Sequence, residues 1–317
     1  MIVFPNAKIN LGLRVTRRRP DGYHDLDTIF YPIPLCDALE VVPMSTGQQV
    51  NESTSPQTDI KLHLVGAKLD GCAADDNLVV RAYRLLKAEF ADLPAVGVWL
   101  YKHIPSGAGL GGGSADATFM LRLLNTMFAL GLTDERLEAR AATLGADCPF
   151  FVRNAPVRAT GTGNIFSPVT INLKGYRIVV VKPPVFVSTR EAFGKIDELL
   201  NDERFAVNEE AAPAYDASPS TLTANPSTLT PNLSTLTANP STLTANLSTL
   251  TNDFEQSVFP LHPKLAEIKE TLYRSGAVYA SMSGSGSALY GLFPANVPCP
   301  LTPLDFPGCF FWQGILE

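Results

Sequence analysis

Residues 105–114 read PSGAGLGGGS and place five glycines in one short loop. Glycine has no Cβ, so the backbone amides of such a loop can approach a phosphate group closely. The residues that follow indicate a helix, and its N-terminus adds roughly half a positive charge behind the loop. The loop is therefore predicted to bind a polyphosphate, and a tight turn without a ligand is the alternative.

Two better-known phosphate motifs fit this loop less well. Gly107, Gly109 and Gly112 satisfy G-x-G-x-x-G, and Asp134 follows about 20 residues later, as in dinucleotide-binding folds. A second helix is expected after the first, however, where a βαβ unit requires a strand. A Walker P-loop is excluded because no Lys precedes Ser114.

Lys8 and Asn10 are polar residues within an apolar, strand-like stretch at residues 2–15. Side chains two residues apart share one face of a strand. A charge among apolar side chains needs a partner. We therefore expect Lys8 to point inward with Asn10 beside it, rather than to lie on a surface edge.

The elements that position these residues are predicted from periodicity. Strands are expected at 2–15, 38–43, 60–65, 96–104 and 176–181, and helices at 77–90, after the glycine loop and at about 133–144. Pro20-Asp21-Gly22 is a turn signal. Strands and helices follow without a clean run of parallel units, so the predicted fold class is α+β.

The composition indicates a globular protein large enough for two domains. The chain has 317 residues, 45% of them hydrophobic and 18% charged. A net charge of −6 argues against nucleic-acid binding, and no apolar run approaches the roughly 20 residues that span a membrane. The five cysteines include no CxxC pair, and the amino terminus lacks a basic leader, so we expect a cytoplasmic protein.

Residues 217–251 repeat STLTANP-like units with a period of seven. A coiled coil is disfavoured because each unit has one Leu, and because Thr and the recurrent Asn-Pro disfavour helix. We expect a flexible surface insertion, and the sequence gives no support for a binding role.

Three segments resemble, in order, the motifs of the GHMP kinase superfamily: PNAKINLGLRV, PSGAGLGGGSADA and SMSGSGSALYGLF. The resemblance implies that the glycine loop binds ATP and that Mg²⁺ neutralises the β- and γ-phosphates. It also implies a ribosomal-protein-S5-like domain at residues 1–163 and a ferredoxin-like domain at 164–317, the latter containing the insertion. We expect a monomer or weak homodimer.

Further segments are similar to the members of this superfamily that phosphorylate a cytidine diphosphate-linked methylerythritol, namely PDGYHDLDTIF, LGADCPFFV and NDFE (252–255). The resemblance places Tyr23 and His24 at the cytosine, where Tyr offers a stacking face and His can hydrogen-bond to a base edge. Phe186 is the expected second stacking residue. From these two residues alone, the alternative is that Tyr23 packs in the core and His24 caps a turn.

The implied reaction transfers a phosphoryl group to the 2-hydroxyl of the acceptor, in the non-mevalonate route to isoprenoids. Asp147 is the expected general base, paired with Lys8, and Asn10 is expected to bind substrate hydroxyls. A helix cap after Gly145 is the alternative for Asp147.

The remaining site residues are expected to contact phosphates or substrate. The cofactor-binding set is Lys102, Pro105, Ser106, Gly107, Ala108, Gly109, Leu110, Gly111, Gly112, Gly113 and Ser114, and the second loop adds Gly284, Ser285 and Gly286. N-capping would also explain Ser114, a solvated strand position would explain Lys102, and a tight turn would explain the second loop. His103, Thr162 and Asn164 depart from the superfamily pattern.

Two other interpretations stay open. Another GHMP kinase would keep the glycine loop, Lys8 and Asp147 but use a different acceptor, and base contacts at Tyr23 and His24 distinguish it. A catalytically inactive sensor would keep the glycine loop and lose the base, whereas this chain has both Lys8 and Asp147.

Overall fold

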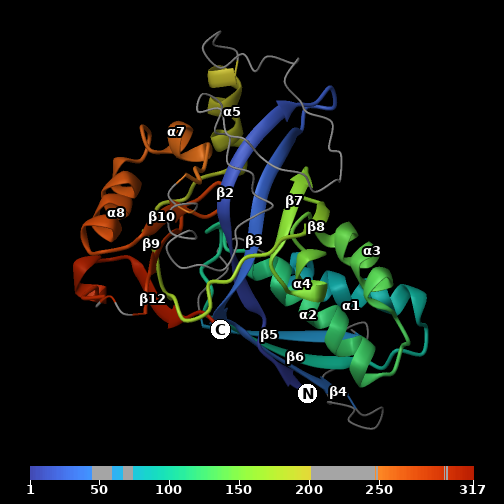
Figure 1. Ribbon diagram of the computed structural model, residues 1–317. Helices are drawn as coiled ribbons and strands as arrows, with labels where there is room; N and C mark the ends of the chain where they lie inside the picture. The colour runs from blue at the N-terminus through green and yellow to red at the C-terminus, as the bar shows by residue number, and fades with distance from the viewer. Residues whose placement is uncertain (45–58, 67–73, 201–246, 248, 296, 298) are drawn as a thin grey trace.

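The computed structural model describes residues 1–44, 59–66, 74–200, 247, 249–295, 297 and 299–317. Within these ranges the chain forms three four-stranded β-sheets with helices packed on them (Figure 1). The predicted α+β class is confirmed. Most of the predicted insertion at 217–251 lies outside the described residues.

The amino-terminal sheet has the strand order β1-β4-β6-β5. Its strands are β1 (Ile2–Val3), β4 (Ala38–Pro43), β5 (Ile60–Gly66) and β6 (Val96–Lys102). The helices beside it are α1 (Leu78–Glu89), α2 (Gly112–Met127) and α3 (Asp134–Leu144), with the 3₁₀ turn η1 (Ala74–Asp76) before them. Leu39 and Val98 of the sheet share a buried core with Leu86 and Leu121 of the helices. Because β6 enters the glycine loop and α2 leaves it, this core holds both ends of the loop.

The hairpin sheet has the order β2-β3-β7-β8. Its strands are β2 (Asn6–Arg18), β3 (His24–Cys36), β7 (Val157–Gly161) and β8 (Ile165–Pro168), and the short helix α4 (Phe150–Arg153) precedes β7. The β2–β3 hairpin stands between helices α1–α4 and the carboxyl-terminal part of the chain (Figure 1). Ile9 and Leu11 of β2 join the core, and the alternate residues Lys8 and Asn10 therefore face the other way.

The carboxyl-terminal sheet has the order β10-β11-β9-β12, and all its neighbours are antiparallel. Its strands are β9 (Arg177–Lys182), β10 (Tyr279–Met282), β11 (Leu289–Phe293) and β12 (Phe310–Ile315). Its helices are α5 (Thr189–Leu200), α7 (Phe254–Val258) and α8 (Pro263–Arg274), with the 3₁₀ turn η4 (Pro303–Asp305). Ile178 and Val180 pack against Ile9 and Ile33, so one core joins this sheet to the hairpin sheet.

Most predicted elements form within a few residues of their expected ends. The strand expected at 2–15 is divided at Phe4-Pro5 into β1 and β2, because Pro has no N–H to donate to a sheet. Strands β3, β7, β8, β10, β11 and β12 were not predicted. The second helix after the glycine loop is α3, so the strand of a dinucleotide-binding unit is not there.

The predicted domain boundary at 163/164 falls in the turn between β7 and β8. These two strands pair with each other in the hairpin sheet. The division into domains stays a prediction.

Among the described residues, every helix is too short or too polar to span a bilayer.

Candidate active site

A cavity of 1240 Å³ lies where the hairpin sheet, the glycine loop and the start of α5 meet. Every residue predicted for the site lines it, including the three residues of the second loop. These residues come from positions as far apart as Lys8 and Gly286. The fold therefore brings the predicted residues together, while their individual roles stay predictions.

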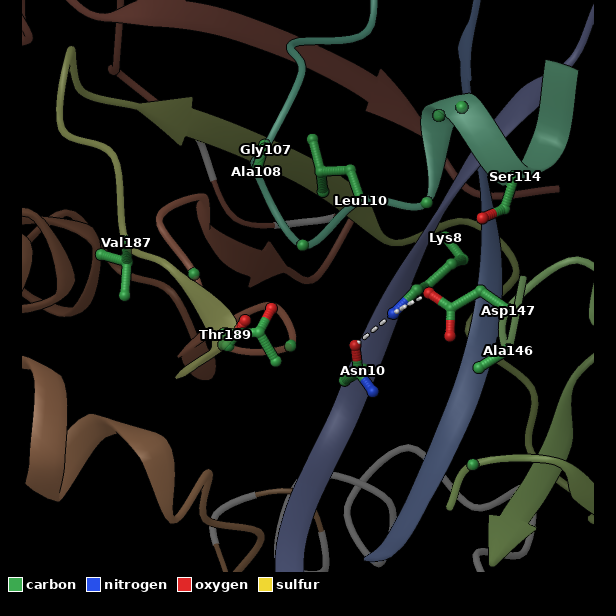
Figure 2. Close-up of a pocket in the computed structure, with 18 of the residues that line it drawn as sticks. Lys8, Asn10, Gly107, Ala108, Leu110, Ser114, Ala146, Asp147, Val187 and Thr189 are labelled. Carbon is green, nitrogen blue, oxygen red and sulfur yellow. Dashed lines mark hydrogen bonds and ion pairs between the residues drawn. The ribbon is translucent and has the colours of Figure 1, made fainter. Parts of the chain in front are cut away.

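Lys8 and Asp147 form an ion pair on one wall of this cavity (Figure 2). The distance from Lys8 Nζ to Asp147 Oδ2 is 3.4 Å, and the side chains are 4% and 34% exposed. Lys8 therefore points inward with a partner, as expected. Asp147 does not cap a helix, because α3 ends at the cap Gly145 and α4 begins after Pro149. The carboxylate is open to the cavity while the ammonium beneath it is buried.

Asn10 holds the other side of the Lys8 ammonium (Figure 2). Lys8 Nζ donates to Asn10 Oδ1 at 2.7 Å, and Asn10 Nδ2 donates to Thr28 Oγ1 at 3.1 Å. Both ends of the buried amide are thus used, which fixes its orientation. The ammonium also lies 4.6 Å from the centre of the Phe30 ring. Its position is therefore set from three sides.

The glycine loop packs directly on the second loop. A Cβ on Gly109, whose φ is +75°, would lie 1.9 Å from the carbonyl oxygen of Ser283. Ser283 Oγ donates to the carbonyl of Gly109 at 2.8 Å, and Ala288 N–H donates to the carbonyl of Ala108 at 3.1 Å. Only glycine permits this approach, so the second loop has a packing function against the first.

The glycine loop ends in the N-terminus of α2. Gly111 is the N-cap, with a φ of +72°, and a Cβ there would lie 3.0 Å from Phe151 and 3.1 Å from Lys8. Ser114 is the third residue of the helix, so the N-cap explanation for this Ser is wrong. Its side chain lies at the cavity near Lys8 and Asp147 (Figure 2).

Lys102 is buried in an ionic cluster, so its interpretation as a solvated strand residue is wrong. Its Nζ pairs with Asp37, and it lies 2.6 Å from Asp116 Oδ2. The three side chains are at most 3% exposed. Asp37 also accepts from the backbone N–H groups of His103 at 2.6 Å and Ile104 at 2.8 Å. This cluster ties β6 to the start of α2 at the base of the glycine loop.

Burial shifts the proton affinities of this cluster. It raises the pKa of Asp116 to about 7, with Lys102 opposing the shift and Asp37 adding to it. Burial alone lowers the pKa of Lys102, but the two carboxylates outweigh it and the net pKa is raised. Asp116 Oδ1 has no hydrogen-bond partner among the described residues. Asp37 and Asp116 were not predicted as site residues, because neither stands in a sequence pattern that indicates a buried charge.

Tyr23 lies just before β3, and Phe186 lies between β9 and α5; both line the cavity. They are 67% and 71% exposed, so the alternative interpretation that Tyr23 packs in the core is wrong. Phe186 lies over the glycine loop, where a Cβ on Gly107 would be 3.1 Å from its ring. His24 is only 6% exposed yet still lines the cavity. Two open aromatic rings and one buried imidazole thus line the same cavity.

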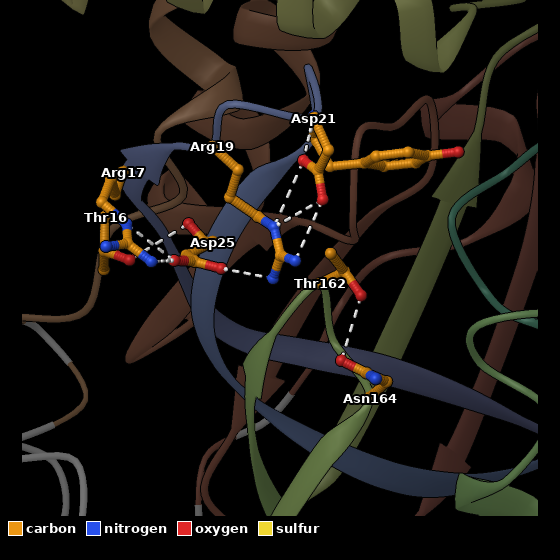
Figure 3. A network of polar contacts seen from close by, with 8 residues as sticks. Thr16, Arg17, Arg19, Asp21, Asp25, Thr162 and Asn164 are labelled. Atoms are coloured by element: carbon orange, nitrogen blue, oxygen red, sulfur yellow. Dashed lines mark hydrogen bonds and ion pairs between the residues drawn. The ribbon is translucent and has the colours of Figure 1, made fainter.

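Charged side chains order the tip of the β2–β3 hairpin (Figure 3). Arg19 Nη2 lies 3.0 Å from Asp21 and Arg19 Nη1 3.3 Å from Asp25, and Arg17 Nη2 lies 2.7 Å from Asp25. Asp21 also accepts from the N–H of Tyr23 at 3.1 Å. Hydrogen bonds from the arginines hold the pKa of both carboxyl groups below the usual range. The network therefore shapes the turn that presents Tyr23.

Thr162 and Asn164 lie in the turn between β7 and β8. Thr162 Oγ1 donates to Asn164 Oδ1 at 3.0 Å (Figure 3). Thr162 lines the cavity. These neutral residues thus bond to each other where the superfamily pattern has charged ones.

Asn252 holds the second loop from behind. Its Nδ2 donates to the carbonyls of Met282 and Gly284, each at 2.8 Å, and its Oδ1 accepts from Phe254 N–H at 3.0 Å. Asn252 is 2% exposed. Asn252 stands in the segment NDFE, and no local sequence pattern reveals its partners.

The family comparisons match two regions of the chain. The profile for the GHMP kinases N terminal domain matches residues 77–154, and the profile for the GHMP kinases C terminal region matches residues 238–297. The first region contains the glycine loop and Asp147, and the second contains Gly284–Gly286.

Curated relatives match over nearly the whole chain. The 4-diphosphocytidyl-2-C-methyl-D-erythritol kinase of Bacteroides thetaiotaomicron is 51% identical over 95% of each chain. The enzyme of the same name from Porphyromonas gingivalis is 44% identical over 100% of each chain.

Solved structures share the fold. A crystal structure of 4-(cytidine 5'-diphospho)-2C-methyl-D-erythritol kinase superposes with a TM-score of 0.69 at 29% identity, covering 99% of this chain and 98% of the other. The Methanococcus jannaschii mevalonate kinase has a TM-score of 0.64 at 13% identity, covering 100% and 98%, which shows the fold alone.

Proposed function

The chain belongs to the 4-diphosphocytidyl-2-C-methyl-D-erythritol kinase family of GHMP kinases, and we propose that it phosphorylates the 2-hydroxyl of that cytidyl substrate. It is a kinase that uses ATP and a small-molecule acceptor. The reaction is a step in the non-mevalonate pathway of isoprenoid biosynthesis.

The observation that carries the proposal is the Lys8–Asp147 pair beside the glycine loop in one cavity. Asp147 is the general base and accepts the proton of the acceptor hydroxyl. Lys8 lies 3.4 Å from Asp147, so its charge keeps the carboxylate oriented and stabilises the negative charge that develops on the transferred group. Asn10 Oδ1 accepts from the Lys8 ammonium and Nδ2 donates to Thr28, so the second Nδ2 hydrogen is the one that can meet a substrate hydroxyl.

The phosphates of ATP lie against residues 105–114 and the N-terminus of α2. The backbone amides of the loop and the helix dipole supply positive potential without a Walker lysine. Lys102 does not supply positive potential to the phosphates directly, because its ammonium is paired with Asp37 and Asp116. Its contribution is to hold the base of the loop.

Mg²⁺ accompanies the nucleotide and, when bound, neutralises charge on the β- and γ-phosphates. In the described residues no group of three or more His, Cys, Asp or Glu side chains could hold a metal ion alone. Ser114 lines the cavity and carries the kind of oxygen atom that Mg²⁺ prefers. This donor fits an ion whose other ligands are phosphate oxygens and water.

The cytosine lies between the open rings of Tyr23 and Phe186, with His24 at its edge. Stacking on aromatic side chains is worth roughly 1–3 kcal/mol per base. The exposure of both rings supports this placement, since a ring buried in the core could not receive a base.

We place the protein in the cytoplasm as a monomer or weak homodimer, with domains at 1–163 and 164–317. The four cysteines of the described residues are all free thiols, which is compatible with a reducing compartment. Sedimentation of the purified chain at micromolar concentration tests the oligomeric state.

The function is tested by measuring ADP formation with ATP, Mg²⁺ and 4-diphosphocytidyl-2-C-methyl-D-erythritol, beside mevalonate, homoserine and galactose. We expect turnover of the cytidyl substrate alone, and a fall in kcat of about 10²-fold or more in Asp147→Asn. The control Asp92→Asn removes an exposed carboxylate outside the cavity and should change nothing. Turnover of another acceptor contradicts the substrate, and ATP binding without any turnover favours a sensor.

A further inference from the structure

The imidazole of His24 is stacked on a ring from a different part of the chain. His24 begins β3, and Phe193 lies in α5. Their ring centres are 4.6 Å apart and their planes differ by 19°. Both residues line the cavity, so the contact lies in its wall.

Phe193 is itself supported by the core. Its ring meets Phe254 edge to face, with centres 4.8 Å apart and an angle of 88°. Phe254 is 2% exposed, and its N–H is held by Asn252 Oδ1. His24, Phe193 and Phe254 thus form an aromatic column that runs from the core to the cavity.

Recognition of a base edge depends on the direction of the imidazole plane. A histidine side chain has two rotatable bonds, and a hydrogen bond weakens steeply when its angle departs from linear. A ring stacked at 19° restricts rotation about the second of these bonds. The edge of the imidazole is then already aligned before the base arrives, which lowers the entropic cost of binding.

We propose that Phe193 is a positioning residue for substrate specificity, which orients His24 toward the cytosine of the acceptor. The proposal rests on the proposed function, because it assumes that His24 contacts a cytosine. Phe193 acts through His24, and it has no part in phosphoryl transfer at Lys8 and Asp147.

The test compares Phe193→Leu, which keeps an apolar side chain but loses the ring, with Phe193→Tyr, which keeps the ring. The matched control is Phe259→Leu, because Phe259 is also half-buried against the same core cluster and does not line the cavity. KM for each substrate and kcat are measured in all variants and in the unchanged protein.

We expect Phe193→Leu to raise KM for the cytidyl acceptor roughly 2- to 10-fold, which corresponds to the interaction free energy of one aromatic pair. KM for ATP and kcat should stay unchanged, and Phe193→Tyr should restore the acceptor KM. An unchanged acceptor KM in Phe193→Leu, or equal rises in both KM values, overturns the proposal. An equal effect of Phe259→Leu also overturns it, because any loosening of the core would then suffice.

Two further measurements separate the possible failures. If the unchanged protein does not turn over the cytidyl acceptor, the proposed function fails, and this inference fails with it. If Phe193→Leu does not fold, NMR of the unchanged protein decides: the carbon-bound ring protons of His24 should show an upfield ring-current shift. Normal shifts for these protons would mean that the stack does not persist in solution.

Discussion

The carbonyl oxygen of Ser283 lies 1.9 Å from the point where a Cβ on Gly109 would stand. The two residues are 174 positions apart, and Ser283 Oγ also donates to the carbonyl of Gly109. The loop that is proposed to hold the phosphates and the second loop at residues 284–286 are therefore one packed unit. Displacing either loop must displace the other.

Gly109→Ala is expected to abolish ATP binding, because the added methyl clashes with backbone and cannot be relieved by a side-chain rotation. The variant also forces a non-glycine residue to a φ of +75°. Gly131→Ala is the control, since Gly131 has a φ of +70° but nothing within 4 Å of the added Cβ. Calorimetric titration with ATP should show loss in the first variant and normal binding in the second. Normal binding in Gly109→Ala would refute the packed unit.

Lys8→Met is expected to lower kcat by about 10²-fold or more, since the charge beside Asp147 is removed. Because Lys8 and Asp147 act as a pair, the double variant Lys8→Met/Asp147→Asn should be scarcely slower than the worse single variant. Single-turnover kinetics measure the chemical step in all three. Fully multiplicative effects would show that the two residues act independently.

Asp116→Asn is expected to change the pH dependence of stability. The pKa of Asp116 is raised to about 7 by burial, so the folded state keeps its proton at a pH where the unfolded chain, with a value of 3.8, has lost it. This group's contribution to the free energy of unfolding therefore decreases as pH rises from about 4 to 7, by up to about 1.4 kcal/mol per unit. Asn cannot ionise, so the variant should gain stability relative to the unchanged protein as pH rises from 5 to 7.

Urea unfolding at several pH values measures this difference. Asp305→Asn is the control, because bonds from Thr302 lower the pKa of Asp305 and its carboxylate is ionised across that whole range. Its effect should be the same at each pH. A pH-independent effect of Asp116→Asn would show that Asp116 stays ionised in the folded protein.

Phe186→Ala is expected to raise KM for the cytidyl acceptor about 5- to 150-fold through loss of a stacking face. Stability should hardly change, because the side chain is 71% exposed. Leu304→Ala removes another exposed apolar side chain, 89% exposed and outside the cavity, and should leave KM unchanged. A normal acceptor KM in Phe186→Ala would exclude this ring from the cytosine site.

The local features of this protein were determined by the sequence. The glycine loop, the helix after it and the shared face of Lys8 and Asn10 each follow from residues a few positions apart, where backbone geometry dictates the outcome. The pairing of Lys8 with Asp147 was expected only from the resemblance to known kinases. Strand β3 was missed although it is largely buried, because its polar residues interrupt the alternation that indicates a strand.

The tertiary structure decided the contacts between distant segments. The sequence around Lys102 is equally compatible with a solvated strand residue. Its burial depends on the ion pair with Asp37, which is 65 positions away. The stacking of Phe193 on His24 and the hydrogen bonds from Asn252 to the second loop likewise join separate elements. Such contacts depend on how the three sheets pack, and no local pattern records that packing, because burial and hydrogen bonding are properties of the assembled fold.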